Sequence, residues 1–185
     1  QKNWKSNIYG YDKDSKAIEF AKSYSQKTRS NFNLHTIDTL SIGKDLFIDK
    51  NFNKKFDIII GNPPYVRSQR IQNNYISFLK RSYKTISKGS FDLSVVFLEK
   101  ISELLNDGGI ASLILTNKFM TSAYGKEVCN YLAKNFRILT IEDFNDIQLF
   151  QGYTTYTCIL TFAKLDHSKR FLVKKYKNKD NFNEK

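Results

Sequence analysis

The chain has 185 residues, and its 30 Lys and Arg against 18 Asp and Glu give a formal net charge of +12 at pH 7. This length suits one domain with a sizeable core. Because no run of about 18 apolar residues is present, we expect no membrane-spanning helix. The first residues also lack the apolar segment of a signal peptide. Cys129 and Cys158 have no metal-ligand spacing, so the sequence favours a cytoplasmic protein with reduced thiols and no metal site.

Strand and helix patterns alternate along the chain, which predicts an α/β fold with a mostly parallel sheet. Residues 8–12 are typical of a short strand, and Asp14 or Ser15 can cap the helix that follows. Residues 34–37 form a second strand candidate. Residues 56–60 are apolar on both faces of a strand, so we expect this third strand to be covered by helices on both sides.

The second half of the chain predicts further helices and strands. An apolar stripe over residues 90–105 predicts a helix that ends at the turn Asn106–Gly109. Strands are expected at 110–115, 138–144 and 156–162, with a helix near 125–135. The connection before the last strand is short, so the last two strands should pair in an antiparallel way.

The most informative segment is Asn62-Pro63-Pro64-Tyr65, which follows the apolar residues 56–61. Two consecutive prolines lack N–H groups and fix φ, so a strand has to end there. The stiff backbone presents the Asn62 side-chain oxygen and the Pro63 carbonyl as two acceptors, and the Tyr65 ring as a stacking surface. This arrangement suits a planar substrate. A strand that ends in a Pro-Pro turn with a packed tyrosine is the simpler alternative.

Residues 56–65 resemble the catalytic motif of the amino-methyltransferases that use S-adenosylmethionine, in particular the adenine-N6 DNA methyltransferases. The resemblance looks closest to the type IIG-like branch, which is fused to restriction enzymes, and it covers residues 8–163. It continues in order through Ile8–Asp12, Ile37–Asp38, Phe91–Leu93, Gly108–Met120 and Phe150–Gly152. It implies a Rossmann-like methyltransferase fold whose mostly parallel sheet has an antiparallel last strand.

The resemblance also predicts a domain organisation. Residues 1–163 would form the methyltransferase catalytic domain, and residues 164–185 a basic linker or the edge of a following domain. Members of the family begin with a strand and a Gly-rich turn that cradle the cofactor, and no Gly-x-Gly turn precedes Ile8. We therefore expect a partial domain without its first strand. We also expect further domains of the same protein, for target recognition and with or without an endonuclease.

Acidic residues at strand ends are candidates for binding S-adenosylmethionine, the expected cofactor. Asp12 ends the first strand, where an acid in nucleoside sites accepts hydrogen bonds from both ribose hydroxyls. A helix cap is the alternative role for Asp12. By resemblance, the Asp38 carboxylate would bind the adenine amino group of the cofactor, Leu40 would pack on its ring, and Asn62 would contact it too. The alternative for Asp38 is an ordinary loop acid.

The catalytic residues implied by the resemblance are Asn62, Pro63, Pro64 and Tyr65. The exocyclic amine of adenine is a poor nucleophile because its lone pair is delocalised into the ring. The Asn62 oxygen and the Pro63 carbonyl can hold both N–H groups and direct the lone pair at the methyl group, so catalysis needs positioning rather than a strong base. Asp57 would lie about 16 Å from Asn62 by strand rise, and we assign it a structural role.

A base inside a duplex cannot be reached, so the target adenine has to be flipped out of the helix. A flipped purine needs aromatic faces on which to stack. Tyr65 provides one of them and, by resemblance, Phe150 provides the other. Core packing is the alternative role for Phe150, in which case Tyr153 or Tyr156 could be the second ring.

The segment between Val66 and Ser90 contains basic residues and no Asp or Glu, which suits contact with double-stranded DNA. The alternative is a solvated basic surface. The candidates for contacts to the DNA backbone are Arg67, Arg70, Arg81 and Lys84. The sequence thus predicts methylation of adenine N6 in DNA within a restriction–modification protein. Two alternatives stay open: methylation of another planar nitrogen, on a release-factor glutamine or a ribosomal guanine, and a non-catalytic DNA-binding remnant.

Overall fold

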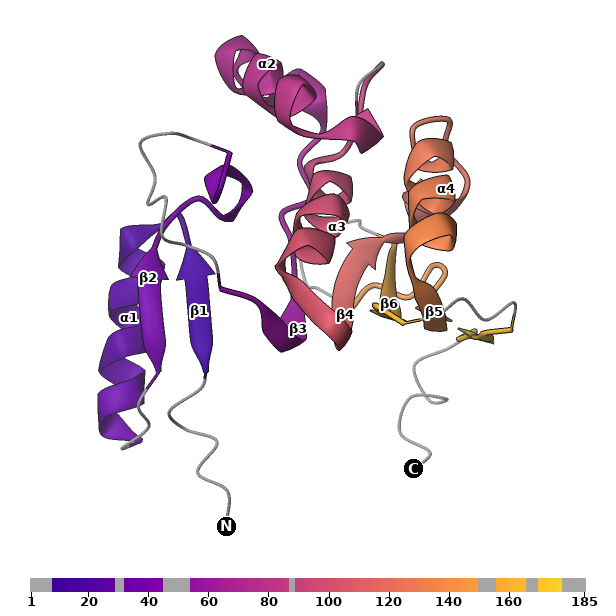
Figure 1. Ribbon diagram of the computed structural model, residues 1–185. Helices are drawn as coiled ribbons and strands as arrows, with labels where there is room; N and C mark the ends of the chain where they lie inside the picture. Colours follow the sequence, from indigo (N-terminus) through magenta and orange to yellow (C-terminus); the bar gives the residue numbers. More distant parts are fainter. Residues whose placement is uncertain are drawn as a thin grey trace. The chain divides into compact units, whose positions relative to one another are not determined.

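The computed structural model describes residues 8–28, 32–44, 54–86, 89–149, 156–165 and 170–177. The chain divides into two compact units, Gln1–Asn53 and Lys54–Lys185, and Figure 1 shows the elements of each unit. Both units combine strands with helices, as the alternating sequence pattern predicts. No helix within the described ranges is long and apolar enough to cross a membrane.

The first unit is a β-α-β arrangement. Strand β1 (Tyr9–Asp12) pairs in parallel with β2 (Asn33–Thr36), helix α1 (Ser15–Lys27) connects them, and the short 3-10 helix η2 (Thr39–Ser41) follows. Of the two capping candidates, Asp14 is the cap of α1, because its side chain accepts a hydrogen bond from the Lys16 N–H at 2.9 Å. The strands expected near residues 8–12 and 34–37 are therefore confirmed.

The second unit is built on a five-stranded sheet with the order β3-β4-β6-β5-β7. Its strands are β3 (Phe56–Gly61), β4 (Leu105–Thr116), β5 (Arg137–Asp143), β6 (Thr157–Ala163) and β7 (Leu172–Lys175). β3 is parallel to β4 and β7 is parallel to β5, whereas β6 runs antiparallel to both of its neighbours, β4 and β5. The antiparallel pairing expected for the last two predicted strands is thus confirmed.

Three α-helices accompany this sheet: α2 (Asn73–Ser82), α3 (Leu93–Leu104) and α4 (Gly125–Asn135). The short 3-10 helix η3 (Ser68–Arg70) precedes α2, η4 (Lys84–Ile86) lies between α2 and α3, and η5 (Asn117–Met120) lies between α3 and α4. α3 is buried on nearly all sides and contacts β4, α4 and η4. In Figure 1, α2 lies at the top of the view, away from the strands of this unit.

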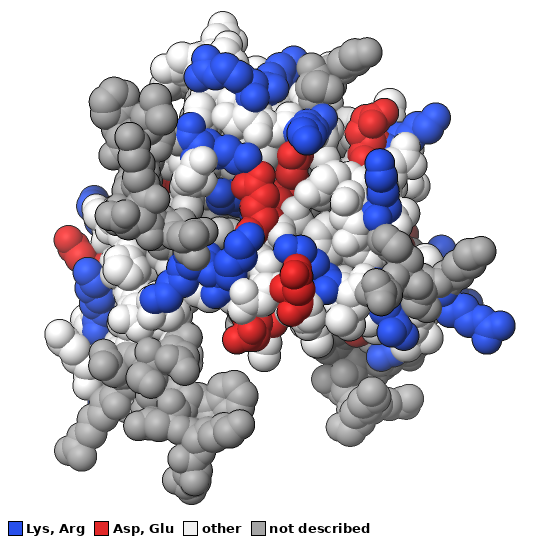
Figure 2. Space-filling model, viewed as in Figure 1, with Lys and Arg blue, Asp and Glu red and all other residues white. Residues whose placement is uncertain are grey.

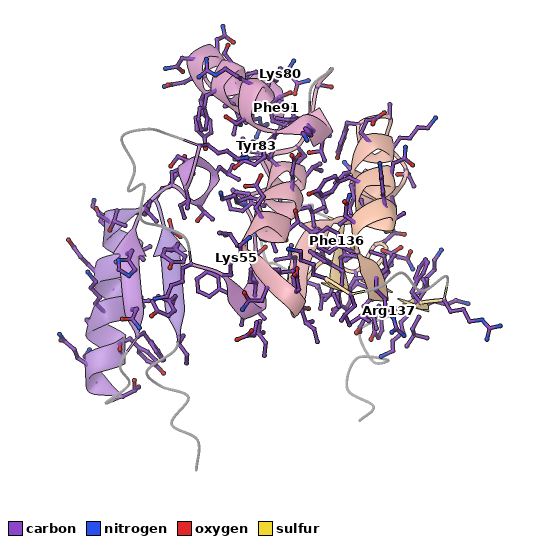
Figure 3. The ribbon with its side chains drawn as sticks, in the orientation of Figure 1. Lys55, Lys80, Tyr83, Phe91, Phe136 and Arg137 are labelled. Atoms are coloured by element: carbon purple, nitrogen blue, oxygen red, sulfur yellow. The ribbon has the colours of Figure 1, made fainter. Side chains whose placement is uncertain are left out.

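Aromatic side chains hold the helices of this unit in place. The ring of Phe136, which follows α4, meets the ring of Phe162 in β6 edge-on, with centroids 5.0 Å apart. Tyr83 and Phe91 are both buried, and Figure 3 shows them below α2, beside the first turn of α3. The core of the second unit therefore extends from the sheet through α3 to the end of α2.

A buried carboxylate ties η4 to α3. Glu99 of α3 is 4% exposed, and its two carboxylate oxygens accept hydrogen bonds from the N–H groups of Lys84, at 3.0 Å, and Thr85, at 2.9 Å. The first N–H groups of a short helix have no partner within that helix. Glu99 supplies these partners, so its burial is compensated by two charge-assisted hydrogen bonds.

Strand β3 is less buried than the sequence predicts. Ile58 is 64% exposed and Ile60 is 80% exposed, so the expectation of a strand covered on both faces is wrong. Among the described strands of the second unit, β3 lies at the edge of the sheet and pairs with β4.

The turn expected at Asn106–Gly109 is an irregularity within β4 rather than a break before it. α3 ends at Leu104 and β4 begins at once, and the pairing register with β3 shifts between Phe56 and Ile58. Gly108 has a φ of 83°, which an L side chain rarely adopts. Gly108 is therefore a left-handed position that lies inside the strand.

Strand β7 lies in a segment in which the sequence predicts no strand. We expected residues 164–185 to be a linker or the edge of a following domain, yet Leu172–Lys175 pairs in parallel with β5 in the sheet of the second unit. Leu172 is 52% exposed and Val173 is 48% exposed. A short edge strand of this kind has neither a clear alternation nor a buried run, so the sequence carries little signal for it.

Candidate functional site

The Asn62-Pro63-Pro64-Tyr65 loop begins immediately after β3, as the two prolines require. Pro63 is buried, whereas Asn62 and Pro64 are exposed and Tyr65 is partly buried. The Tyr65 hydroxyl donates a hydrogen bond of 2.6 Å to the Asn62 Oδ1. This bond orients the carboxamide at the carboxyl end of β3, with its oxygen fixed in place.

Backbone hydrogen bonds clamp the following residues to the segment that precedes α3. The Leu93 N–H donates to the Val66 carbonyl at 2.8 Å, and the Ser68 N–H donates to the Phe91 carbonyl at 2.8 Å. The Phe91 N–H in turn donates to the Ser68 Oγ at 3.2 Å. These hydrogen bonds fix the segment that follows Tyr65 to the segment that precedes α3. Tyr65 is therefore held in a defined position, as catalysis by positioning requires.

Asp92 has a structural role in this bridge. It is 6% exposed, and its Oδ1 accepts hydrogen bonds from the Ser94 N–H at 3.0 Å and the Ser94 hydroxyl at 2.6 Å. It is therefore the cap of α3. The family-like segment Phe91–Leu93 thus fixes where α3 begins and supports the loop from the side.

The environment of Tyr65 keeps its hydroxyl protonated. Burial, together with the smaller effects of the nearby Cys158 and Asp92, raises the pKa of Tyr65 to about 12. Burial likewise raises the pKa of the Cys158 thiol to about 12. A raised tyrosine pKa favours the neutral phenol, so Tyr65 remains a hydrogen-bond donor to Asn62 throughout the neutral and moderately alkaline range.

We expect Tyr65→Phe to leave the phenol titration of the native protein unchanged between roughly pH 9 and 11, the range in which ordinary tyrosines ionise. The reason is that Tyr65, with a pKa of about 12, does not ionise there. Ultraviolet difference titration of the variant against the parent protein measures this directly. Loss of one phenol that titrates near pH 10 would contradict the assignment.

A pocket of about 940 Å³ opens beside this loop. Aromatic side chains, three cations and one carboxylate line it together with small polar groups. Its wall comes from segments that are distant in the sequence: the loop after β3, the residues before α3, the end of β4, the turn before α4, and the residue before β6. The lining residues are Tyr65, Arg67, Gln69, Arg70, Ser90, Phe91, Asp92, Thr116, Lys118, Thr121, Ser122, Tyr124 and Tyr156.

Three of the four candidate cofactor residues, Asp12, Asp38 and Leu40, belong to the first unit, whereas Asn62 belongs to the second. Asp12 is exposed at the end of β1, and its Oδ1 accepts a hydrogen bond from the Asp14 N–H at 2.8 Å. Asp38 follows β2, and its Oδ1 accepts from the Leu40 N–H at 3.0 Å, so it caps η2. Leu40 is 1% exposed. Because β1 and β2 are parallel neighbours, the two acids lie at the same edge of this small sheet.

The four candidates for DNA contacts fall into two groups. Arg67 and Arg70 line the pocket, whereas Arg81 lies in the last turn of α2 and Lys84 begins η4. All four side chains are exposed. Figure 2 shows Lys and Arg side chains gathered over α2 at the top of the view, with an acidic patch below them in the middle of the same face.

Several lining residues were not candidates from the sequence. Lys118 and Tyr124 join the pocket only because η5 and the following turn lie next to the Asn62 loop. Tyr156, an alternative stacking ring, does line the pocket, whereas Phe150 and Tyr153 lie outside the described residues. Within the described ranges no group of three or more His, Cys, Asp and Glu side chains could hold a metal ion.

Known proteins are similar to this chain in sequence and in fold. The chain matches the model of the family described as "Eco57I restriction-modification methylase" over residues 6–150. It is 32% identical over 118 residues to the type II restriction enzyme and methyltransferase RM.Eco57I of Escherichia coli, which covers 62% of this chain and 12% of that protein. The chain therefore spans about an eighth of the length of this relative.

Two solved structures share the fold. A putative class I S-adenosylmethionine-dependent methyltransferase from Listeria monocytogenes has a TM-score of 0.72 at 18% identity, over 92% of this chain and 49% of its own. The type IIG restriction endonuclease BpuSI has a TM-score of 0.68 at 18% identity, over 89% of this chain and 20% of its own. The expected cofactor, S-adenosylmethionine, is the one for which this fold class is named. The chain belongs to the Eco57I restriction-modification methylase family and has the Rossmann-like α/β fold of S-adenosylmethionine-dependent methyltransferases.

Proposed function

We propose that the chain is the catalytic part of a site-specific DNA methyltransferase that is adenine-N6 specific. In this proposal it transfers the methyl group of S-adenosylmethionine to the exocyclic N6 of an adenine flipped out of double-stranded DNA, within a restriction–modification protein. One observation carries the proposal. The oriented Asn62 carboxamide and the Pro63 carbonyl stand at the end of β3, beside a pocket with aromatic walls and three cations.

Asn62 and Pro63 would activate the amine by accepting its two N–H groups. Held in this way, the nitrogen moves toward tetrahedral geometry and its lone pair points away from the ring plane. The Tyr65 hydroxyl already occupies one lone pair of the Asn62 Oδ1. A carboxamide oxygen has a second lone pair, so Asn62 can accept the amine while Tyr65 continues to orient it. Pro64 keeps the turn stiff between them.

The residues of the first unit fit the adenosine part of S-adenosylmethionine. Asp12 is exposed at the carboxyl end of β1 and would accept hydrogen bonds from the ribose hydroxyls. Asp38 would accept from the adenine amino group, and Asn62 would lie near the reacting end. Leu40 is 1% exposed, so its side chain offers the ring little surface on which to pack. When bound, the cofactor supplies an electrophilic methyl group on a sulfonium centre. The chain's own contribution is to orient the amine and to exclude water around it.

The target base would stack on Tyr65, which lines the pocket with its hydroxyl held by Asn62. Phe150 is the second stacking ring in this proposal. The surrounding segments would hold the DNA backbone through Arg67, Arg70, Arg81 and Lys84, all of which are exposed. Each aromatic face contributes about 1–3 kcal/mol to holding an extruded base.

We also propose that residues 1–163 act as one methyltransferase domain within a longer protein. The family match covers residues 6–150, which includes parts of both units. The chain spans about an eighth of the E. coli relative, whose name combines a restriction enzyme with a methyltransferase. Domains for target recognition, with or without an endonuclease, would supply the sequence specificity.

Asp12→Ala should weaken S-adenosylmethionine binding by about tenfold or more, because the carboxylate would lose charged hydrogen bonds to the ribose. Turnover at saturating cofactor should change little, since the ribose contact is the same in the ground and transition states. Calorimetric titration of the full-length protein measures the binding. Asp14→Ala is the matched control, because it removes the α1 cap two residues away without a role toward the cofactor. Equal losses in both variants would reduce Asp12 to a local structural residue.

Labelled methyl transfer tests the proposed function as a whole. The full-length protein is incubated with methyl-labelled S-adenosylmethionine and, in separate reactions, with double-stranded DNA, a release-factor peptide that contains a glutamine, and ribosomal RNA. We expect label only in the DNA, recovered after digestion as N6-methyldeoxyadenosine. Label in the peptide or the RNA and none in DNA would replace the proposal by one of the alternatives, and no label anywhere would favour a non-catalytic remnant.

A further inference from the structure

One part of the pocket wall has no role in the proposed chemistry so far. Lys118 lies in η5, directly after β4, and Tyr156 directly precedes β6. β4 and β6 are antiparallel neighbours whose last pair is Thr116 with Thr157, and the Asn117 N–H extends this ladder by donating to the Tyr156 carbonyl at 3.0 Å. The backbone thus places Lys118 next to Tyr156, and the Lys118 Nζ lies 6.0 Å from the centre of the Tyr156 ring.

Buried hydrogen bonds make this corner of the pocket rigid. The Asn117 Nδ2 donates to the Asp143 Oδ1 at 3.0 Å, and the same oxygen accepts from the Asn145 N–H at 3.0 Å. Asp143 is 7% exposed at the end of β5. The Lys118 N–H is held by the Thr116 hydroxyl oxygen at 3.2 Å. These hydrogen bonds hold the ends of β4, β5 and β6 together, whereas the Lys118 side chain is exposed.

The three cations that line the pocket have no described carboxylate as an ion-pair partner. Lys118, Arg67 and Arg70 form no ion pair with any described residue, although all three line the pocket. Asp92 is the one carboxylate among the lining residues, and its Oδ1 is engaged by Ser94. A distance of 6.0 Å is the outer limit of a cation–π contact, so the ring holds the ammonium only weakly.

Unpaired cations at the rim of a pocket with aromatic walls fit a ligand that has both a flat ring and an anionic group. A nucleotide within a DNA strand has this combination, and phosphate contacts from Lys are the usual means of fixing its register. A cavity of about 940 Å³ has room for one nucleotide with its flanking phosphates.

We propose that Lys118 is a positioning residue that binds a phosphate next to the flipped nucleotide, and that Tyr156, beside it, forms part of the wall on which the base stacks. This inference rests on the proposed function. In the structure the ammonium lies over the Tyr156 ring, and it exchanges this weak contact for the phosphate when the base enters. Lys118 thus couples recognition of the strand to insertion of the base.

A chemical double-mutant cycle tests the proposal. The target adenine is first located by mapping the methylated positions in DNA treated with the full-length protein. Phosphates within two nucleotides of that adenine are then replaced, one at a time, by neutral methylphosphonates. At one of these positions, we expect the methylphosphonate to raise the KM of the parent protein for DNA by about tenfold, because a charged hydrogen bond is lost. The KM of Lys118→Met for unmodified DNA should be higher than that of the parent by about the same factor. The methylphosphonate at that position should not raise the KM of Lys118→Met any further.

Controls separate this role from a general effect of charge or folding. Lys126→Met removes an exposed lysine of α4 that does not line the pocket, and it should respond to every methylphosphonate as the parent does. Lys118→Arg keeps the positive charge, so its KM for DNA should be close to that of the parent. Tyr156→Leu should reduce the quenching of a 2-aminopurine placed at the target position, and Tyr156→Phe should not.

The outcomes distinguish this proposal from the one on which it rests. Suppose that the parent methylates DNA and that every methylphosphonate raises the KM of Lys118→Met by the same factor as that of the parent. Lys118 then binds no phosphate, and the inference is overturned. If the parent methylates no DNA, the proposed function fails first, and this inference fails with it. Normal 2-aminopurine quenching in Tyr156→Leu would remove Tyr156 from the stacking wall and leave Phe150 as the candidate ring.

Discussion

Asn62→Ala should abolish methyl transfer while the protein remains folded. The carboxamide is exposed at the end of β3, and its described partner is the Tyr65 hydroxyl, so its removal leaves the core intact. The loss of one acceptor that positions the reacting amine should cost about 3 kcal/mol or more in the transition state, which corresponds to at least a hundredfold in turnover. Single-turnover methylation of an adenine-containing duplex measures this effect directly.

Asn106→Ala is the matched control for Asn62→Ala. Asn106 lies at the other end of the β3–β4 pair, where its Nδ2 donates to the Asp57 Oδ1 at 2.8 Å. This contact agrees with the structural role that the sequence predicts for Asp57. The control should lower stability slightly and leave turnover at its parent level. An Asn62→Ala variant that kept more than about a tenth of parent turnover would show that Asn62 does not position the amine.

Replacement of Arg67, Arg70, Arg81 and Lys84 by Gln should greatly weaken binding to DNA. If each side chain contacts one phosphate, the slope of log K against log salt should fall by roughly 3–4 units, because fewer counterions are released on binding. Titration of a fluorescent duplex over a range of salt concentrations measures the slope. Cofactor affinity should not change, because Asp12, Asp38 and Leu40 lie in the other unit of the chain and Asn62 is left intact.

A second quadruple variant controls for the loss of net charge. Lys22, Lys27, Lys126 and Lys134 are exposed on α1 and α4, and none of them lines the pocket. Their replacement by Gln removes the same charge and should alter the slope much less. Equal slopes of log K against log salt for the two variants would mean that DNA binding depends only on the net charge of the protein, which is +12 in the parent. Replacement of Arg67 and Arg70 alone would then show whether the pocket contributes at all.

The local features of this protein follow from short stretches of its sequence. The caps of α1 and α3 are contacts between residues two positions apart, Asp14 with Lys16 and Asp92 with Ser94. The two prolines end β3 wherever the strand lies, because they remove its N–H donors. The order of strands and helices apart from α2 and β7, the antiparallel pairing of β5 and β6, and the family to which the chain belongs could therefore be predicted from the sequence.

Burial and the composition of the pocket depend on which elements lie next to one another, and only the tertiary structure decided them. The sequence predicts Ile58 and Ile60 as core residues, yet both are exposed, because burial depends on what packs against each face of a strand. β7 is a strand only because β5 offers it a free edge. Lys118 and Tyr156 are 38 positions apart in the chain. They meet because β6 inserts between β4 and β5, and no local pattern encodes which strand a distant segment will pair with.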